Sequence, residues 1–180
     1  ESVSDAEPLT PEERLTQGPA FGEIDLAATG TNPGADWSTY RAGSARSGLA
    51  STAIPTDLQL GWKAELPKAT SYSAPVIADG RVFVACIDAD TLCALDAESG
   101  ELEWTFTAGG RIDSPPTIIG NAAIFGSADG SIYCLRTSDG ALAWRCLAAP
   151  CDRRIVSYGR VESSWPVHGN VLAIGDTVYA

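Results

Sequence analysis

The segment ALDAESGELEW at residues 94–104 returns forty residues later as CLRTSDGALAW at residues 134–144. Glycine and tryptophan keep their places, as Gly100 and Trp104 in the first copy and Gly140 and Trp144 in the second. A repeat of this length marks one supersecondary unit that cannot bury its apolar face alone and has to stack on its neighbours. The sequence therefore predicts a repeat architecture.

Each copy belongs to a unit of four short strand patterns joined by tight turns. In the first unit, residues 73–107, strands are predicted at residues 74–77, 81–86, 91–95 and 101–107. In the second unit, residues 114–147, they are predicted at residues 116–119, 122–127, 131–135 and 141–147. Asp-Gly pairs between apolar runs are a strong hairpin signal, because glycine takes a positive φ without steric cost. Four strands in about forty residues is typical of a β-propeller blade.

The apolar pattern of these strands favours a propeller over an open sheet. The run at residues 82–84 is continuously apolar, and so are those at residues 76–77 and 118–119. Such strands need burial on both faces, which a blade between two neighbouring blades obtains. A β-sandwich is the alternative, since it shares the strand spacing but not the repeat. We predict an all-β protein, a β-propeller of four-stranded antiparallel blades.

The flanking segments predict an incomplete ring. Residues 58–66 alternate apolar and polar side chains and are expected to form an entering strand. Residues 170–180 repeat the first two strands of a third unit, and residues 148–169 form a loop insertion before it. Residues 35–180 would then hold about two and a half blades. Residues 1–34, which carry four prolines and many small and acidic side chains, are expected to be a poorly ordered leader or linker, with a short helix possible at residues 10–15.

Composition limits the classes of partner. The chain has 180 residues, 12 Lys and Arg against 23 Asp and Glu, and a formal net charge of -11. This balance argues against nucleic acid or an anionic membrane surface as the main partner, because phosphate neutralisation needs clustered cations. No apolar run has the length of about 20 residues that a membrane helix needs. The sequence contains no methionine, and residues 1–5 have neither the basic start nor the apolar stretch of a signal peptide, so we expect a piece of a longer protein.

The five cysteines do not follow a metal-binding spacing. Cys86, Cys93 and Cys134 lie within apolar strand patterns, where a cysteine usually serves as a small buried hydrophobe, and we expect reduced thiols there. Cys146 and Cys151 are close enough in sequence for a disulfide, although the residues between them do not demand one. No C-x-x-C pair is present.

The residues of the first copy resemble a known family. Ala94, Asp96, Gly100 and Trp104 are similar to the tryptophan-docking repeat of the pyrroloquinoline quinone (PQQ)-like β-propellers, which include quinoprotein alcohol dehydrogenases and the lipoprotein of the outer-membrane assembly machinery. The segments at residues 36–48 and 163–169 resemble stretches of planctomycete-type PQQ-like repeat proteins. The second copy departs from the motif, with Cys134 and Arg136 in place of the alanine and aspartate.

The resemblance implies a structural role for the motif. The glycines, Gly100 and Gly140, would permit the turn between the third and fourth strands, and the tryptophans, Trp104 and Trp144, would lie against the adjoining blade. It also implies an extracytoplasmic location, in the periplasm or cell envelope. The partners that it implies are the remaining blades of the full-length chain and, in addition, other proteins. We expect no cofactor within this chain; PQQ and calcium would bind only if the full-length protein is a quinoprotein dehydrogenase.

The insertion contains the best candidate binding residues. Arginine and aromatic side chains are enriched at binding hot spots, and seven candidates gather here: Arg153, Arg154, Tyr158, Arg160, Glu162, Trp165 and His168. An arginine–carboxylate network that fixes a long loop is the alternative, and the one we favour. His168 is the only histidine and, without a spaced acid and nucleophile, is expected to be a hydrogen-bonded loop residue rather than a general base.

No residue set in the sequence forms a convincing catalytic centre. Asp88 and Asp90 could supply half of a calcium loop, but a solvated turn is the expected state, because the glycine and terminal glutamate of a hand-type loop are missing. The adjacent cysteines of many quinone dehydrogenases do not occur. We therefore expect a non-catalytic binding or scaffold module. The alternatives are a quinoprotein oxidoreductase whose site lies outside these residues, and an accessory propeller fused to an enzyme.

Overall fold

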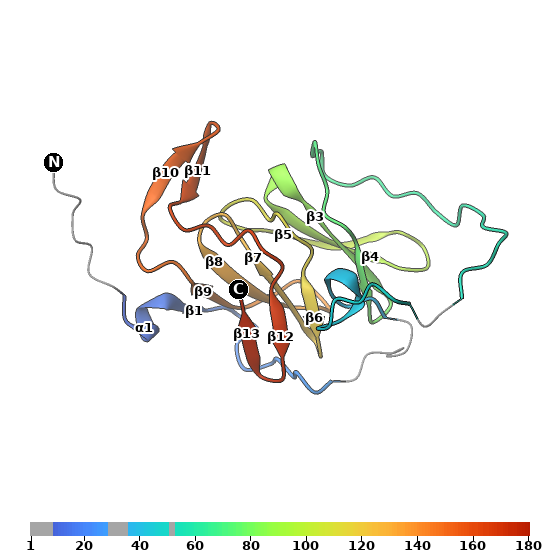
Figure 1. Cartoon of the computed structure of the whole chain (residues 1–180), viewed down its shortest axis with the longest axis horizontal. Helices are drawn as coiled ribbons and strands as arrows, with labels where there is room; N and C mark the ends of the chain where they lie inside the picture. Colours follow the sequence, from blue (N-terminus) through green and yellow to red (C-terminus); the bar gives the residue numbers. More distant parts are fainter. Residues whose placement is uncertain (1–8, 29–35, 51–52) are drawn as a thin grey trace.

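Two antiparallel sheets form the centre of the molecule (Figure 1). The computed structural model describes residues 9–28, 36–50 and 53–180. The first sheet, blade 1, has the order β2-β3-β4-β5 and its strands are Val76–Ala78, Arg81–Cys86, Thr91–Asp96 and Leu102–Thr107. The second, blade 2, has the order β6-β7-β8-β9 with strands Thr117–Ile119, Ala122–Gly126, Ser131–Arg136 and Leu142–Leu147. The predicted four-stranded units and their order are confirmed.

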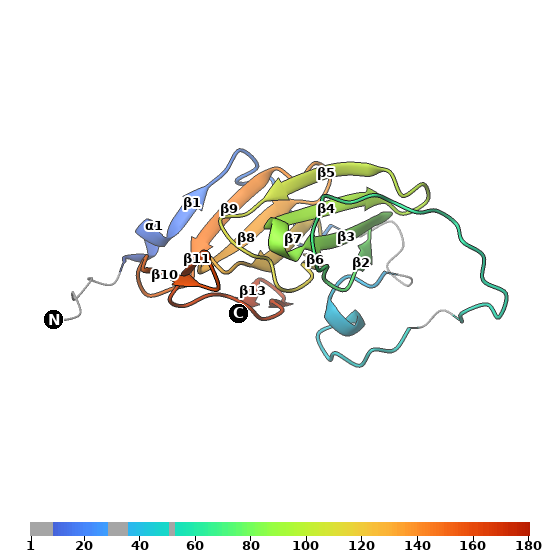
Figure 2. The ribbon, with the colours of Figure 1, turned by 90° about the horizontal axis from the view of Figure 1, so that it is seen from above.

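The two blades lie side by side and share one core (Figure 2). Phe83 and Leu92 of blade 1 and Phe125 and Leu135 of blade 2 are fully buried in the same apolar cluster. The ring of Phe125 stacks on that of Tyr133, with centroids 5.4 Å apart and an interplanar angle of 6°. All five residues of β7 are buried, as the continuously apolar strand patterns predict for a sheet enclosed on both faces.

Tryptophan and glycine of the repeat join one blade to the next. The Nε1 of Trp104, on the outer strand of blade 1, donates to the carbonyl oxygen of Thr137 in blade 2 at 2.9 Å. Trp62 makes the equivalent contact one unit earlier, donating to the carbonyl oxygen of Ala97 at 3.0 Å. In the turn beside Ala97, the Oδ1 of Asp96 accepts hydrogen bonds from the Ser99 amide and hydroxyl. Ala94 lies buried in the core between the blades.

The far face of blade 2 is covered by the start of the third unit. The strands β12, Leu172–Ile174, and β13, Thr177–Tyr179, form the predicted hairpin. Val171 and Val178 pack with Ile124 and Cys134 of blade 2, and Trp144 lies at the rim of this cluster. Among the residues that the structure describes, no glycine turn receives the Trp144 indole.

Residues 58–66 do not form the strand that their alternation predicts. They have no regular secondary structure, and Leu58 and Leu60 are exposed. Alternation favours an extended backbone, but a strand also needs a neighbouring strand to take its hydrogen bonds, and the described residues provide none here. The segment is held instead by Trp62 and by Ala64 and Leu66, which cover a face of blade 1.

The leader, residues 1–34, is the segment in which the structure differs most from the prediction. Pro11–Arg14 forms the short helix α1, capped by Thr10 as expected. The strand β1, Leu15–Gln17, then pairs antiparallel with β9 and makes blade 2 five-stranded. Residues 18–25 continue along the blade, where the amides of Gly18 and Ala20 donate to the carbonyls of Ala143 and Leu142. The described part of the leader is therefore part of the packed structure and not a free linker, while residues 1–8 and 29–34 lie outside the described residues.

Candidate functional site

The insertion at residues 148–169 contains a hairpin at residues 154–163. Its strands are β10, Arg154–Ser157, and β11, Arg160–Ser163, joined by the two residues Tyr158 and Gly159. Both joining residues have positive φ, 48° and 76°, as a type I′ turn requires. The hairpin stands away from the edge of the blades (Figure 1).

The base of the insertion is fixed to the turn between β7 and β8. The Ser163 amide donates to the carbonyl of Ala128 at 2.8 Å, and the Val167 amide donates to that of Ser127 at 3.1 Å. A side chain at Gly126 or Gly130 would overlap Val167 or Ser163, so these glycines allow the close approach. The insertion therefore has a defined position relative to blade 2.

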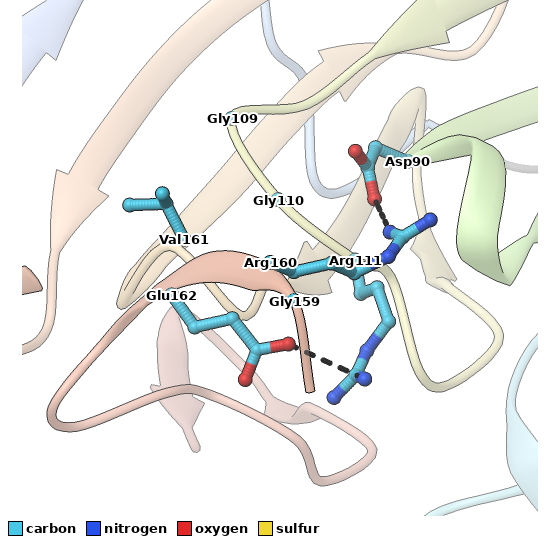
Figure 3. Close-up of a pocket in the computed structure, with 8 residues that line it drawn as sticks. All are labelled: Asp90, Gly109, Gly110, Arg111, Gly159, Arg160, Val161 and Glu162. Atoms are coloured by element: carbon cyan, nitrogen blue, oxygen red, sulfur yellow. Dashed lines mark hydrogen bonds and ion pairs between the residues drawn. The ribbon is translucent and has the colours of Figure 1, made fainter. Parts of the chain in front are cut away.

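Two ion pairs fix the hairpin to the loops of blade 1 (Figure 3). The Arg160 guanidinium lies 3.0 Å from Asp90 Oδ1 and also donates to the carbonyl of Asp88. The Arg111 Nη1 lies 3.3 Å from Oε1 of Glu162, whose side chain is only 7% exposed. Arg111 comes from the loop between β5 and β6, so three loops meet at this point. The structure thus brings the predicted residues Arg160 and Glu162 together.

A cavity of about 400 Å³ lies between these loops. It is lined by Asp90, Gly109, Gly110, Arg111, Gly159, Arg160, Val161 and Glu162. Arg111 Nε and Glu162 Oε1 have ion-pair partners at 3.1 and 3.3 Å, yet among the described residues neither atom has a well-directed hydrogen bond. Charged walls with spare hydrogen-bonding capacity suit a small polar ligand rather than an apolar one.

His168 belongs to a neighbouring contact. Its Nδ1 lies 2.5 Å from Asp113 Oδ2, and the other oxygen of Asp113 is 3.1 Å from Arg111 Nε. This chain of contacts links the insertion to the loop between the blades, which is the hydrogen-bonded role expected for this histidine. Trp165 and His168 also line a second cavity of about 340 Å³.

The other predicted residues lie away from the ion pairs. Arg154 pairs with Asp152 at 2.7 Å, and Tyr158, at the tip of the hairpin, is 99% exposed. The carbonyl oxygen of Arg153 accepts a hydrogen bond from the Ser164 amide at 2.9 Å, and the Arg153 side chain is exposed. The seven candidates therefore divide into an ionic base, in which Glu162 is buried and Arg160 is partly exposed, and an exposed outer part.

One face of the hairpin carries exposed apolar side chains. Antiparallel pairing places Val156 opposite Val161 on one face, and Ile155 opposite Glu162 on the other. Val156 and Val161 are 77% and 61% exposed, and Val161 points away from the ion pairs (Figure 3). With Tyr158 they form an exposed surface, which we call the hairpin face.

Asp88 and Asp90 point to different partners. Asp88 accepts hydrogen bonds from the Thr70 hydroxyl at 2.6 Å and from the amides of Thr70 and Ser71. These donors lower the pKa of Asp88 to about 2. Since Asp90 pairs with Arg160, the two carboxylates act as anchors for two different segments. The two carboxylates thus bind separate protein groups, Thr70 and Arg160, and do not face a common point as the ligands of one cation would.

Sequence reasoning missed Arg111 and Asp113. Both lie in the loop between the fourth strand of one unit and the first strand of the next, which is the position that the insertion occupies one unit later. Equivalent connections of neighbouring blades emerge at the same edge, so the repeat itself contained the signal that these loops meet. The hairpin within the insertion had no comparable signal, because residues 154–157 do not alternate and, of the joining residues Tyr158 and Gly159, only the glycine favours the positive φ that the turn requires.

The strand order, the shared core and the glycine–tryptophan contacts define two adjoining blades of a β-propeller. The family model described as outer membrane protein assembly factor BamB (PQQ_2) matches residues 48–180. The chain belongs to this family of PQQ-like repeat proteins.

Solved structures with the same fold include two dehydrogenases. Quinohemoprotein alcohol dehydrogenase ADHIIG from Pseudomonas putida HK5 is 16% identical, with a TM-score of 0.59 over 71% of this chain and 22% of its own. A europium-containing methanol dehydrogenase is 14% identical, with a TM-score of 0.60 over 81% of this chain and 27% of its own. At these identities the likeness concerns the fold alone.

A sequence relative is the DNA damage-responsive serine/threonine-protein kinase RqkA of Deinococcus radiodurans. It is 28% identical over 116 residues, which make up 61% of this chain and 17% of the kinase. The chain thus spans about a quarter or less of the length of these relatives. Among the described residues, no helix is long and apolar enough to cross a membrane.

Proposed function

We propose that these blades belong to a non-catalytic binding or scaffold module that engages another protein through the hairpin face. The observation that carries the proposal is the exposure of Val156, Tyr158 and Val161 on a hairpin whose base is held by ion pairs. A rigidly supported apolar patch loses little conformational entropy on binding, which favours its use as a contact surface.

The proposal includes the location of the protein and the chemistry of its partner. Family membership supports an extracytoplasmic location in a bacterial cell envelope, with further blades of the full-length protein as intramolecular partners. The net charge of -11 argues against nucleic acid as the partner. Arg153 and Arg154 lie beside the apolar residues, so the surface suits a partner that combines apolar and acidic side chains.

Site-specific photo-crosslinking tests this function. A benzophenone amino acid is placed at Val156 of the full-length protein in its native cells, and at Leu49 as the control. Leu49 has the same exposed fraction, 77%, but lies outside the insertion. We expect a crosslink to a second protein from position 156 and none from position 49. Crosslinks from position 156 to peptides of the same chain alone would show that other blades cover the hairpin face.

Two enzymatic alternatives have their own tests. The fold shared with alcohol and methanol dehydrogenases favours a quinoprotein oxidoreductase whose site lies on blades outside these residues. Calcium-dependent dye reduction by the full-length protein after addition of PQQ would support it and overturn the non-catalytic role. The match to part of a kinase favours an accessory propeller fused to an enzyme. A catalytic domain encoded in the same gene would support that case.

A further inference from the structure

Cys86 and Cys93 lie next to each other inside blade 1. Their Sγ atoms are 3.6 Å apart, and both residues are fully buried. The register of β3 and β4 pairs Cys86 with Thr91 and Cys93 with Val84, so the two cysteines occupy a diagonal position on one face of the sheet. Diagonal neighbours of this kind are within reach of each other across an antiparallel pair.

The surroundings of this thiol pair are apolar. Leu95 and, from outside the sheet, Ala64, Leu66 and Ala69 pack against the two cysteines. In residues 9–28, 36–50 and 53–180, no group of three or more histidine, cysteine or acidic side chains gathers around a common point. A stable metal site needs more ligands than two thiols, whereas a covalent bond between the thiols needs no third side chain, only an oxidant that accepts two electrons. The arrangement therefore favours a crosslink.

We propose that Cys86 and Cys93 are the site of a disulfide that links β3 to β4 within blade 1. In the reaction, one cysteine thiolate attacks a sulfur of glutathione disulfide and releases one glutathione. The second thiolate then attacks the mixed disulfide and releases another. The two protein sulfurs lose two electrons and two protons, and the two glutathione sulfurs gain them. The sulfurs have to move closer by about 1.5 Å, given an S–S bond of about 2 Å.

Access to the thiols is controlled by the segment at residues 64–69. Burial raises the pKa of both thiols, that of Cys93 to about 12, so the reactive thiolate is scarce while the segment is in place. The segment is held on one side by Trp62, which donates to Ala97, and on the other by Thr70, which donates to Asp88. The disulfide therefore forms during folding before this segment docks, or afterwards when the segment detaches.

Peptide mapping tests the proposal directly. The full-length protein is unfolded, refolded with glutathione disulfide, denatured again with iodoacetamide and digested with trypsin. The peptide at residues 82–111 contains Cys86 and Cys93 and no other cysteine, and the peptide at residues 112–136 contains only Cys134. We expect the first peptide to be lighter than its reduced form by two hydrogen atoms and unalkylated, and the second to carry one alkyl group. Two alkyl groups, or glutathione, on residues 82–111 would overturn the proposal.

A kinetic experiment on the folded, reduced protein does not depend on refolding. Glutathione disulfide is added and loss of free thiol in the peptide at residues 82–111 is followed. We expect slow oxidation in the parent and at least tenfold faster oxidation in Trp62→Ala, because this variant loosens the covering segment. Exposed Leu49→Ala serves as the control and should oxidise at the parental rate. Equal rates in all three proteins, or no crosslink in any, would contradict the proposal.

Discussion

Trp104 packs against the α-carbon of Gly140 so closely that a methyl group added there would lie 2.6 Å from the indole Cε3 atom. The same relationship joins Trp62 to Gly100, where the added methyl group would lie 2.5 Å from the indole. In both cases the indole nitrogen donates to a carbonyl of the same turn. Glycine thus has two functions in each turn, allowing a positive φ and leaving room for the preceding unit.

These two functions of glycine can be separated by mutation. Gly140→Ala should lower the free energy of unfolding by about 2–4 kcal/mol, from the left-handed backbone and the overlap with Trp104 together. Gly80 has nearly the same φ, 72° against 70°, and nothing near its α-carbon, so Gly80→Ala should cost only about 1–2 kcal/mol. Chemical denaturation measures both. Equal losses would mean that the contact with Trp104 does not constrain this position.

Gly18 provides a test of how the leader is held on blade 2. A side chain at this position would overlap the backbone of Leu142 in β9. We therefore expect Gly18→Ala to detach β1 and to raise the hydrogen exchange rate of the Ala20 amide, which donates to Leu142, by at least tenfold. The Ala123 amide within blade 2 should keep its rate.

Gly43→Ala is the matched control for the leader experiment. Gly43 has an extended backbone and no atom near its α-carbon. Its substitution should leave the exchange of the Ala20 amide unchanged. If Gly18→Ala also leaves that amide protected, the leader is held by the ion pair of Glu23 with Arg136 rather than by the close backbone approach at Gly18.

The sequence could predict the blades because their strands are determined locally. The predicted β3 at residues 81–86 has the observed bounds, and the Asp79-Gly80 pair forms the expected turn with positive φ at both residues. Continuous apolar runs identified strands buried on both faces, and the glycine and tryptophan spacing identified the unit. These signals lie within about forty residues of one another and do not depend on distant partners.

The sequence could not show which segments find a distant partner. Residues 15–17 have no strand signal of their own, and they pair because the edge of β9 is open to them. Residues 58–66 have the signal and no partner among the described residues. Arg136 stands where the repeat motif has an aspartate, and the leader explains this difference. Its guanidinium pairs with Glu23 of the leader as well as with Asp139 in the turn of blade 2. Such contacts depend on the tertiary arrangement and not on local pattern.

Glu162 tests the ionic base of the hairpin. Glu162→Gln should leave Arg111 Nη1 without a charged partner, with only the Asp113 pair at Nε, and should lower the free energy of unfolding by about 1–3 kcal/mol. Because the two strands of the hairpin have no other sheet to pair with, the Ile155 amide, which lies opposite Glu162 in the register of the two strands, should exchange faster as well. Glu98→Gln, on an exposed turn where Glu98 has no ion pair with the described residues, is the control and should change neither quantity. An unchanged exchange rate of the Ile155 amide in Glu162→Gln would show that Arg160 and Asp90 hold the hairpin by themselves.

The hydrogen bonds of Asp88 should make the stability of the fold depend on pH in the acid range. Its pKa in the folded protein is about 2, below the value of about 3.9 for a free aspartate, so its contacts stabilise the fold fully above about pH 4. That contribution is lost as the pH falls from about 4 through 2, because the protonated carboxyl accepts the hydrogen bonds of Thr70 and Ser71 less well.

Amide NMR between pH 6 and 1 measures this dependence through the chemical shift of the Thr70 amide, which should titrate with a midpoint near 2. Asp88→Asn should abolish the titration and speed hydrogen exchange at Thr70 and Ser71 already at pH 6. Asp57→Asn, an exposed change of the same charge, should leave both unaltered. A Thr70 midpoint near 4 in the parent would mean that Asp88 faces solvent, and that the cover over Cys86 and Cys93 is held on one side only.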